Sequence, residues 1–274
     1  MIQLLEKQKW FLERFGLSPR KIYHRITSSS GPKIICISIP KSGTHLIERA
    51  LCLHPQLYRK PLRTLHEQNI GFPEKLDMYL ANTNYGEIIV SHLKFTPDRL
   101  KILEARNFQS IFVIRDPRDI VVSQAFYVHR NTRHYLYKVF KSRTSTKERI
   151  RLAIEGYPKG GLPSMGQRLQ NYSGWLNSCN VTIRFEELIG EYGGGDLKKQ
   201  RASLQSIYDL IQTPVNDEWI SFIVKNLFSS SSPTFRKGQI GQWKHHFDDE
   251  LKTIFKQTAG NELVKYGYEK DNLW

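Results

Sequence analysis

Three basic segments, far apart in the chain, combine the residue types that bind phosphate groups. The first is the turn at 40–45, PKSGTH, which directly follows the apolar run at 34–39. The second begins at Arg115, after the apolar run at 110–114, and reaches Ser123 eight residues later. The third opens with Arg236, Lys237 and Gly238. Because cationic side chains, hydroxyl groups and helix N-termini all bind anionic oxygens, the three segments together predict one ligand with two separated phosphate groups.

The turn at 40–45 predicts an anion site that backbone and side chains form together. A helix that begins near Thr44 leaves its first N–H groups without intrahelical partners, and its dipole favours an anion. Gly43 allows the backbone to approach closely, and Lys41 adds a cation. Two hydroxyl groups and an imidazole complete the set, at Ser42, Thr44 and His45. The order differs from a Walker A motif because the Lys precedes the Gly, and a purely structural turn is the alternative interpretation.

Arg115 is expected to leave the end of its strand toward the same edge of the sheet. Its planar guanidinium suits a phosphate because it can donate two parallel hydrogen bonds. If the following residues form a helix, Ser123 lies two turns along it and can face the same pocket. Asp116 is interpreted as the cap of that helix. Arg118 and Asp119 are expected to pair with each other or to contribute to the cap.

His92 is the candidate general base, because it follows the apolar run at 87–91 at the predicted ligand edge. An unperturbed histidine pKa of about 6.5 suits proton transfer at neutral pH. A structural histidine is the alternative interpretation at such a position. The other histidines lack metal-ligand spacing beside Cys or carboxylates, including those at 129, 134, 245 and 246, so no metal is predicted.

The composition describes a basic chain with one domain. Its 274 residues, of which 39% are hydrophobic, fit a single α/β domain over 1–274. The net charge of +15 and a pI near 9.7 predict a polyanionic ligand, nucleic acid or an anionic surface, with a solubilising surface charge as the alternative. Three cysteines without zinc or CxxC spacing predict a reducing compartment and therefore a cytoplasmic location.

Residues 1–30 predict an N-terminal amphipathic helix followed by a linker. Leu, Trp and Phe occur among charged residues at helical spacing over 1–16, without the continuous apolar region of a signal peptide. A helix docked on the domain is favoured over a membrane anchor. No apolar run approaches the ~20 residues of a membrane span, so none is predicted.

Strands and helices alternate along the rest of the chain, which predicts a three-layer α/β/α fold with a central, mostly parallel sheet. Strands are expected at 33–39, 87–91, 110–114 and 180–185, and helices at 46–54, 98–106, 120–127, 196–211 and 217–227. Ligands bind beyond the carboxyl ends of such strands, which places the 40–45 turn, His92 and Arg115 at one edge. Mobile segments are expected at 141–151 and 157–166, and flexible connectors at 193–195 and 229–232.

These segments resemble the signatures of the family of sulfotransferases that use 3′-phosphoadenosine 5′-phosphosulfate (PAPS), over nearly the whole chain from 33 to 247. The IPKSGT sequence at 39–44 resembles the family's 5′-phosphosulfate loop. VIRDPRD at 113–119, through Ser123, resembles its 3′-phosphate strand and helix, and RKGQIGQWK at 236–244 its C-terminal signature. Further segments resemble its soluble bacterial branch, at 164–168, 175, 184–188 and 265–268.

The resemblance implies a nucleotide-kinase-like fold and metal-free sulfuryl transfer from PAPS, with 3′-phosphoadenosine 5′-phosphate (PAP) as product. It implies that the amides of 41–45, with Lys41 and Thr44, hold the 5′-phosphosulfate. It also implies a 3′-phosphate site made by Arg115, Ser123, Arg236, Lys237 and the amide of Gly238. His92 would take the proton of the acceptor, while Lys41 would stabilise charge on the bridging oxygen as the S–O bond breaks.

Four positions depart from the family pattern. Leu46 stands where a Trp often stacks on adenine, so the base is expected to rest on other groups such as Phe228. Phe185 replaces a Tyr that often contacts adenine, and Gln242 replaces an Asp of the C-terminal signature. Val90 stands where many members have a Lys, which removes one cation beside the sulfuryl group.

The expected acceptor is a hydroxyl, or a nitrogen, of a small molecule, and a natural product is favoured. The alternative is a nucleotide-binding or nucleic-acid-binding protein without transferase activity, for which salt-dependent DNA binding that survives Lys41→Ala is diagnostic. A nucleotide kinase is a third interpretation, which a Mg²⁺ requirement would favour. The chain is expected to be a monomer or homodimer, without nucleic acid as a partner.

Overall fold

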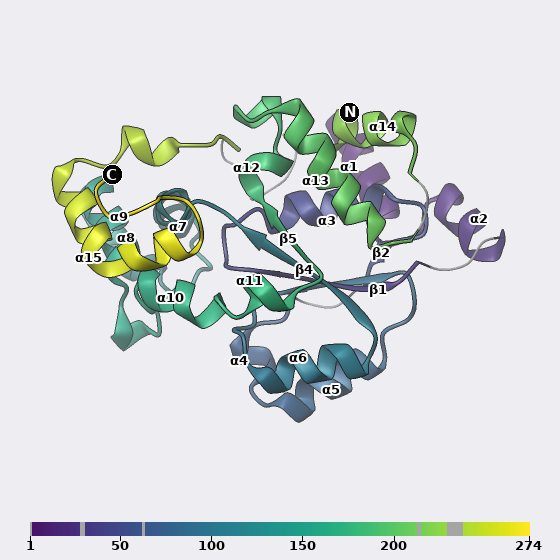
Figure 1. Cartoon of the computed structure of the whole chain (residues 1–274), viewed down its shortest axis with the longest axis horizontal. Helices are drawn as coiled ribbons and strands as arrows, with labels where there is room; N and C mark the ends of the chain where they lie inside the picture. Colours follow the sequence, from purple (N-terminus) through teal and green to yellow (C-terminus); the bar gives the residue numbers. More distant parts are fainter. Residues whose placement is uncertain (1, 28–30, 62–63, 213–214, 229–237) are drawn as a thin grey trace.

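A five-stranded parallel sheet forms the centre of the computed structural model, which describes residues 2–27, 31–61, 64–212, 215–228 and 238–274 (Figure 1). The strands lie in the order β2-β3-β1-β4-β5, and each neighbouring pair is parallel. Their bounds are β1 Lys33–Ser38, β2 Tyr58–Arg59, β3 Glu87–Ser91, β4 Phe108–Ile114 and β5 Val181–Arg184. The four predicted strands are confirmed within two residues. The edge strand β2 was missed, because two residues are too few to show a pattern.

Apolar side chains of the strands alternate between two cores, one on each face of the sheet. In β1, Ile35 and Ile37 belong to one core, while Ile34 and Cys36 belong to the other. This alternation follows from the two-residue period of a strand, and it gives the predicted three-layer α/β/α fold. The first core includes helices α6 Pro97–Ala105, α7 Pro117–Arg130, α9 Thr146–Glu155, α10 Met165–Tyr172 and α15 Asp249–Lys265; the second includes α3 Thr44–Leu53, α13 Leu197–Asp209 and α14 Asp217–Leu227.

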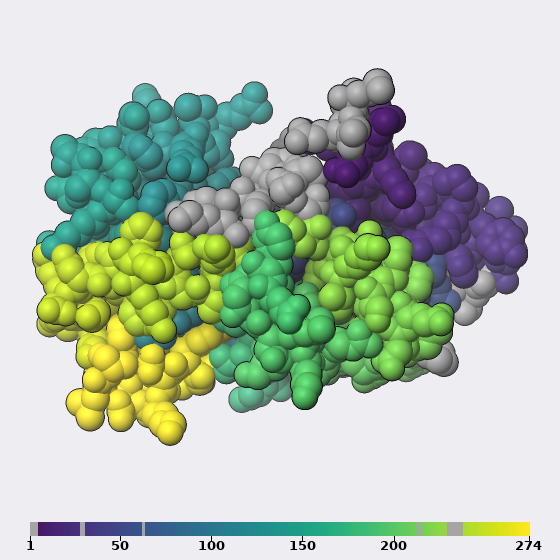
Figure 2. Space-filling view, turned by 90° about the horizontal axis from the view of Figure 1, so that it is seen from above, coloured from purple at the N-terminus to yellow at the C-terminus, as the bar shows by residue number. Residues whose placement is uncertain are grey.

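The predicted N-terminal helix is confirmed and docks on α3, but a second helix follows it. These helices are α1 Ile2–Arg14 and α2 Pro19–Thr27. The Arg49 guanidinium lies 4.3 Å from the ring centroid of Trp10, and Arg14 pairs with Glu48 of α3. Figure 2 shows α1 and α2, in purple, at one end of the molecule and α15, in yellow, at the other.

The expectation of a mobile segment at 141–151 is wrong, because α9 begins inside it. Ser145 Oγ accepts from the backbone N–H of Glu148 at 3.1 Å, and Glu148 Oε2 accepts from that of Ser145 at 3.2 Å. This capping box starts a helix whose apolar residues at 150 and 152–154 are buried. The expectation of mobility rested on the many Lys, Arg, Ser and Thr residues of this segment and overlooked the capping box and the apolar face of the helix.

The remaining glycine-rich segments are also ordered by backbone hydrogen bonds. The segment at 157–166 contains the 3₁₀ turn Pro158–Gly160 and the start of α10. At the expected connector 193–195, Gly195 N–H donates to Gly190 at 2.8 Å, and Ile240 N–H donates to Gly193 at 3.0 Å. The connector expected at 229–232 lies outside the described residues. The other short elements are α4 Glu67–Ile70, α5 Pro73–Ala81, α8 Tyr137–Lys141, α11 Trp175–Ser178, α12 Phe185–Leu188, and the 3₁₀ turns Glu191–Gly193 and Gln242–His245.

Candidate active site

The turn at 40–45 joins β1 to α3 with two residues in the left-handed region. Lys41 has φ 79° and Gly43 has φ 100°, and the Ser42 N–H donates to Ile39 at 3.1 Å. α3 begins at Thr44, and its N-cap residue is Gly43, which has no side chain to cap the first N–H groups. Residues 41 and 43 are left-handed, and such residues in a turn direct successive backbone N–H groups toward one side. This arrangement is typical of an anion-binding nest.

Phe185 lies between the first and second basic segments. A Cβ atom added to Gly43 would lie 2.5 Å from Phe185 Cδ2, so the ring fills the space that any other residue at 43 would need. The Arg115 guanidinium lies 4.3 Å from the ring centroid of Phe185. The ring therefore contacts both the first and the second basic segment.

Arg115 leaves β4 toward the 40–45 turn, as the sequence predicts. Its Nη1 donates to the carbonyl of Lys41 at 3.3 Å, and its Nη2 donates to the carbonyl of Gln239 at 3.2 Å. Among the described residues, its Nε and the buried hydroxyl of Ser42 have no hydrogen-bond partner. Buried polar atoms normally have hydrogen-bond partners, so these two donors are available to hydrogen-bond a bound anion.

The fully buried carboxylate of Asp119 ties α7 to the C-terminal signature. Its oxygens accept from the backbone N–H groups of Gly241 and Trp243, both at 2.8 Å, and Arg115 Nη2 lies 3.9 Å away. The expected pairing of Asp119 with Arg118 is therefore wrong. Arg118 Nη2 instead pairs with Asp116 at 2.8 Å, and its Nη1 pairs with Glu269 at 2.6 Å.

The cap predicted at Asp116 is confirmed, because its side chain accepts from the backbone N–H of Arg118 at 2.9 Å. α7 begins one residue later, at Pro117. Because a helix has 3.6 residues per turn, the residue at which α7 begins decides which of its side chains face the 40–45 turn.

His92 lies just beyond β3, half-buried, with its ring directed at β1. Its Nδ1 lies 2.7 Å from the carbonyl oxygen of Ser38 and 3.3 Å from Ser38 Oγ. The Ser38 hydroxyl also lies 2.8 Å from Thr44 Oγ1, which links the histidine to the first turn of α3. A carbonyl can only accept, so Nδ1 carries the proton and Nε2 keeps its lone pair.

The environment of His92 favours the neutral imidazole. Burial is the largest cause, and it lowers the pKa of His92 to about 3 although the bond to Ser38 acts in the opposite direction. The charges of His66, His45 and Lys41 lower this pKa further. The ring centroid of His66 lies 5.0 Å from that of His92.

Lys41 lies against the face of α7 that carries Ser123. Its Nζ is 3.7 Å from the ring centroid of Tyr127, which lies one turn beyond Ser123 on the same face. Ser123 is half-buried. His45 is exposed and has its Nδ1 3.7 Å from Glu48 Oε2. The structure therefore brings Lys41, Ser123, Arg115 and His92 to one edge of the sheet, while the side chain of His45 faces solvent.

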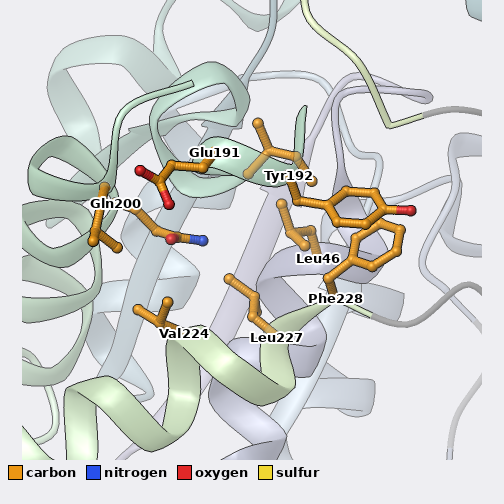
Figure 3. Close-up of a pocket in the computed structure, with 9 residues that line it drawn as sticks. Leu46, Glu191, Tyr192, Gln200, Val224, Leu227 and Phe228 are labelled. Carbon is orange, nitrogen blue, oxygen red and sulfur yellow. The ribbon is translucent and has the colours of Figure 1, made fainter. Parts of the chain in front are cut away.

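A pocket of about 110 Å³ opens beside the first turn of α3. Its aromatic wall is the pair Tyr192 and Phe228, whose rings are stacked with centroids 3.3 Å apart. Figure 3 shows these rings side by side near Leu46, with the polar ends of Glu191 and Gln200 on the opposite side. The remaining lining residues are apolar, at 189, 197, 224 and 227. An aromatic wall, an apolar floor and a few polar groups suit a flat heterocycle.

The third basic segment is described only from Gly238 onward; Arg236 and Lys237 lie outside the described residues. Gly238 has φ 61°, and its carbonyl would lie 2.5 Å from a Cβ atom at Gly193. With the bond from Ile240 to Gly193, this close approach holds the start of the C-terminal signature against the turn that carries Tyr192.

Sequence reasoning missed four residues that contact the site: Ser38, His66, Tyr127 and Tyr192. Ser38 was detectable, because it ends the strand that precedes the predicted anion turn. Tyr127 was also detectable, because it lies four residues after Ser123. His66 and Tyr192 carry no local signal, since only the folding of distant segments brings them near His92 and Phe228.

Two further properties concern only the described part of the chain. None of its helices is long and apolar enough to cross a membrane. It contains no group of three or more His, Cys, Asp or Glu side chains that could hold a metal ion.

Comparison with known proteins places this site in a family. A family model for the sulfotransferase domain matches residues 31–267. A 3-alpha-hydroxysteroid sulfotransferase of Cavia porcellus is 23% identical over 257 residues, which cover 85% of this chain and 84% of the relative. Sulfotransferase 2A1 of Mus musculus is 23% identical over 260 residues, which cover 85% of each chain.

Solved structures share the fold at low sequence identity. Mouse sulfotransferase SULT7A1, complexed with PAP, has a TM-score of 0.60 and 20% identity, with 92% of this chain and 94% of that chain covered. Retinol dehydratase, in complex with androsterone and PAP, has a TM-score of 0.58 and 15% identity, with 89% and 85% covered. The family match spans most of the chain, and the chain therefore belongs to the PAPS-dependent sulfotransferase family and is a sulfotransferase.

Proposed function

We propose that this sulfotransferase moves the sulfuryl group of PAPS to a hydroxyl, or a nitrogen, of a small molecule, with His92 as the general base. The observation that carries the proposal is the 2.7 Å contact between His92 Nδ1 and the carbonyl of Ser38. It leaves Nε2 as an acceptor at the edge of the sheet where the anion-binding turn begins.

The donor would bind with its 5′-phosphosulfate on the 40–45 turn and its 3′-phosphate between Arg115 and Ser123. His92 Nε2 takes the acceptor proton, the acceptor oxygen bonds to sulfur, and the S–O bond to the 5′-phosphate breaks to release PAP. Lys41 would leave the ring of Tyr127 to neutralise the bridging oxygen. Arg236, Lys237 and the amide of Gly238 would complete the 3′-phosphate site.

Donor binding would also activate the base. The cationic surroundings of His92 contribute to its low pKa in the free protein. A polyanionic donor on the neighbouring turn would offset the charge contribution to this low pKa and so raise the pKa, while burial stays its largest cause.

The adenine would occupy the pocket beside Leu46, against Phe228 and Tyr192. Tyr192 supplies an aromatic face on the side where the family Trp is absent, and the polar ends of Glu191 and Gln200 are available to exocyclic and ring nitrogens. PAP is the nucleotide that accompanies mouse SULT7A1 and retinol dehydratase in their structures. The steroid and retinol named for the relatives support a hydroxyl on an apolar molecule as acceptor, and a natural product remains our preferred class.

Calorimetric titration with PAP in EDTA, beside AMP and beside ATP with Mg²⁺, tests the donor site. We expect metal-free binding that requires the 3′-phosphate and that weakens at least about tenfold in Arg115→Ala, because a charge-assisted hydrogen bond contributes about 1.5–3 kcal/mol. Arg106→Ala is the matched control, since its ion pair with Asp77 lies on the surface between α5 and α6. A preference for ATP with Mg²⁺ contradicts the proposal.

A transfer assay with radiolabelled PAPS and a panel of phenols, sterols and amines tests the base. His92→Ala should abolish transfer while PAP still binds. If the variant still transfers the sulfuryl group, another group takes the proton of the acceptor and His92 is not the general base.

A further inference from the structure

Exposed apolar side chains gather on α1 and α2. Among the described residues, fifteen large hydrophobic side chains are exposed, and seven of them lie between residues 5 and 26. They are between 40% and 79% exposed, at Leu5, Phe11, Leu12, Leu17, Ile22, Tyr23 and Ile26. Isolated exposed apolar residues need no explanation, but a cluster on two successive helices does.

On α1 these side chains form one stripe. Leu5 and Leu12 are two turns apart, and the ring centroid of Phe11 lies 4.9 Å from that of Phe15. The opposite face holds the contacts to α3, through Trp10 and Arg14. Because the docked face is fixed, the apolar stripe must face solvent.

α2 is also fixed on one side, by the hydrogen bonds of a buried lysine to the end of α3 and the segment after it. Lys21 is fully buried, and its Nζ donates to the carbonyls of Cys52, at 2.5 Å, and Leu57. Ile22 and Ile26, one turn apart, point away from this anchor and are 42% and 79% exposed. Each of the two helices therefore exposes apolar side chains to solvent. Figure 2 shows both helices, in purple, toward one end of the molecule.

Positive charge surrounds the apolar stripe. Lys7 and Lys9 are exposed and flank the stripe of α1 on its two sides, and Arg25 is exposed on α2. Of the six Lys and Arg at residues 1–27, Lys21 is buried, and Arg14 and Arg20 pair with Glu48 and Glu13. Lys7, Lys9 and Arg25 therefore supply the positive charge of this surface, beside one exposed Glu at position 6. Apolar side chains between snorkelling lysines are the pattern of helices that lie in a membrane interface.

We propose that α1 and α2 form a docking surface for an anionic lipid membrane, on which the folded protein lies without spanning it. A second copy of this chain is disfavoured as the occupant, since two such basic surfaces repel and Lys is depleted in protein interfaces. Figure 1 shows α2 at the end of the long axis opposite α15. The inference does not rest on the proposed reaction.

Co-sedimentation of the full chain with vesicles tests the proposal. We expect binding to equimolar phosphatidylglycerol and phosphatidylcholine, at least about tenfold weaker binding to phosphatidylcholine alone, and release at high salt. Leu5→Ser/Phe11→Ser/Ile26→Ser should lower the partition coefficient on anionic vesicles at least about tenfold, because it removes apolar area from the interface. The matched control is Phe72→Ser/Met78→Ser, since these side chains are 74% and 70% exposed on another part of the surface.

Other outcomes overturn the proposal. Absence of vesicle binding does so, and so does equal binding by the triple serine variant, which would leave charge alone as the cause. If the wild type elutes as a dimer in size-exclusion chromatography, the triple serine variant elutes as a monomer, and neither binds vesicles, the surface is assigned to a second copy of the chain. Lys7→Gln/Lys9→Gln provides a second variant with the apolar stripe intact, and PAP affinity and circular dichroism report whether each variant is folded.

Discussion

A single backbone contact determines how His92 can act. The Ser38 carbonyl holds Nδ1–H at 2.7 Å, and burial keeps the imidazole neutral. In the same site, Asp119 accepts two backbone N–H groups of the C-terminal signature and lies beside Arg115. In both residues, hydrogen bonds to the backbone fix the side chain. The bond to Ser38 leaves Nε2 of His92 as its acceptor atom, and the bonds from Gly241 and Trp243 hold the Asp119 carboxylate beside Arg115.

The pH dependence of the reaction should reveal the low pKa of His92. A lowered pKa keeps the base form populated as the pH falls, so kcat/KM for PAPS, which reports the donor-free enzyme, should not decline as the pH falls through 6.5. At saturating PAPS, the acid limb of the acceptor kcat/KM should lie at higher pH, because the bound anion raises the pKa. Rate profiles between pH 5 and 9 check this, and identical acid limbs in the two measurements contradict it.

Asp119→Asn should weaken PAP binding about tenfold or more without unfolding the chain. The amide keeps the shape of the carboxylate but removes the charge that holds the N–H groups of Gly241 and Trp243, so the C-terminal signature loses its position at the proposed 3′-phosphate site. Comparison of PAP with AMP by calorimetry checks this, because a positioning role should reduce only the part of the affinity that depends on the 3′-phosphate. Asp77→Asn, which breaks an exposed ion pair, serves as the control.

At the level of elements, the site is built where β1, β3 and β4 end beside one another. Parallel pairing aligns Ile37 with Ser91 and Ser38 with Val113, so the residues that follow each strand meet at one edge. The turn after β1 is the most constrained of these connections, because Gly43 combines a positive φ with a ring in the space of its missing side chain.

Gly43→Ala should therefore reduce both stability and donor binding. A left-handed alanine costs about 1–2 kcal/mol, and the approach to Phe185 adds a steric term and displaces that ring from Arg115. Gly161→Ala is the matched control, since Gly161 has φ 72° with nothing within 4 Å of an added Cβ atom. Denaturant unfolding and PAP titration of both variants check this; equal losses of stability would show that only the backbone conformation matters.

At the level of the whole molecule, the buried histidine at position 54 couples the fold to pH. His54 is buried at the end of α3, and burial is the main cause that lowers its pKa to about 4, with the charges of Lys21, Arg20 and His24 acting in the same direction. The unfolded chain therefore binds this proton at higher pH than the folded chain does.

The free energy of unfolding should thus be unaffected by His54 above pH 6.5 and should fall as the pH decreases toward 4. A shift from 6.5 to about 4 corresponds to a loss of about 3 kcal/mol over this interval. Urea unfolding at successive pH values checks this in the wild type and in His54→Gln, where the decline should be shallower. A parallel decline in both proteins contradicts the role of His54.

The sequence by itself determined the parallel α/β class, the positions of its main strands, and the two segments that we propose to bind phosphate. These features are local: buried strands appear as apolar runs, and an anion turn needs Gly, Lys and hydroxyl groups within six residues. The error at 141–151 was also local, because a capping box and a buried face occur within a basic composition. The pairing of Arg118 with Glu269 was not predictable in this way, since Glu269 lies far along the chain, whereas its other partner, Asp116, is local.

Only the tertiary structure decided what each chemical group contacts. The tautomer of His92 depends on Ser38, the pocket wall pairs Tyr192 with Phe228, and Phe185 separates Gly43 from Arg115. These partners lie 36 to 142 residues apart in the sequence. The apolar stripe of α1 could be seen in the sequence, but which of its faces packs on α3 could not, because helical periodicity gives the faces of a helix and not their neighbours.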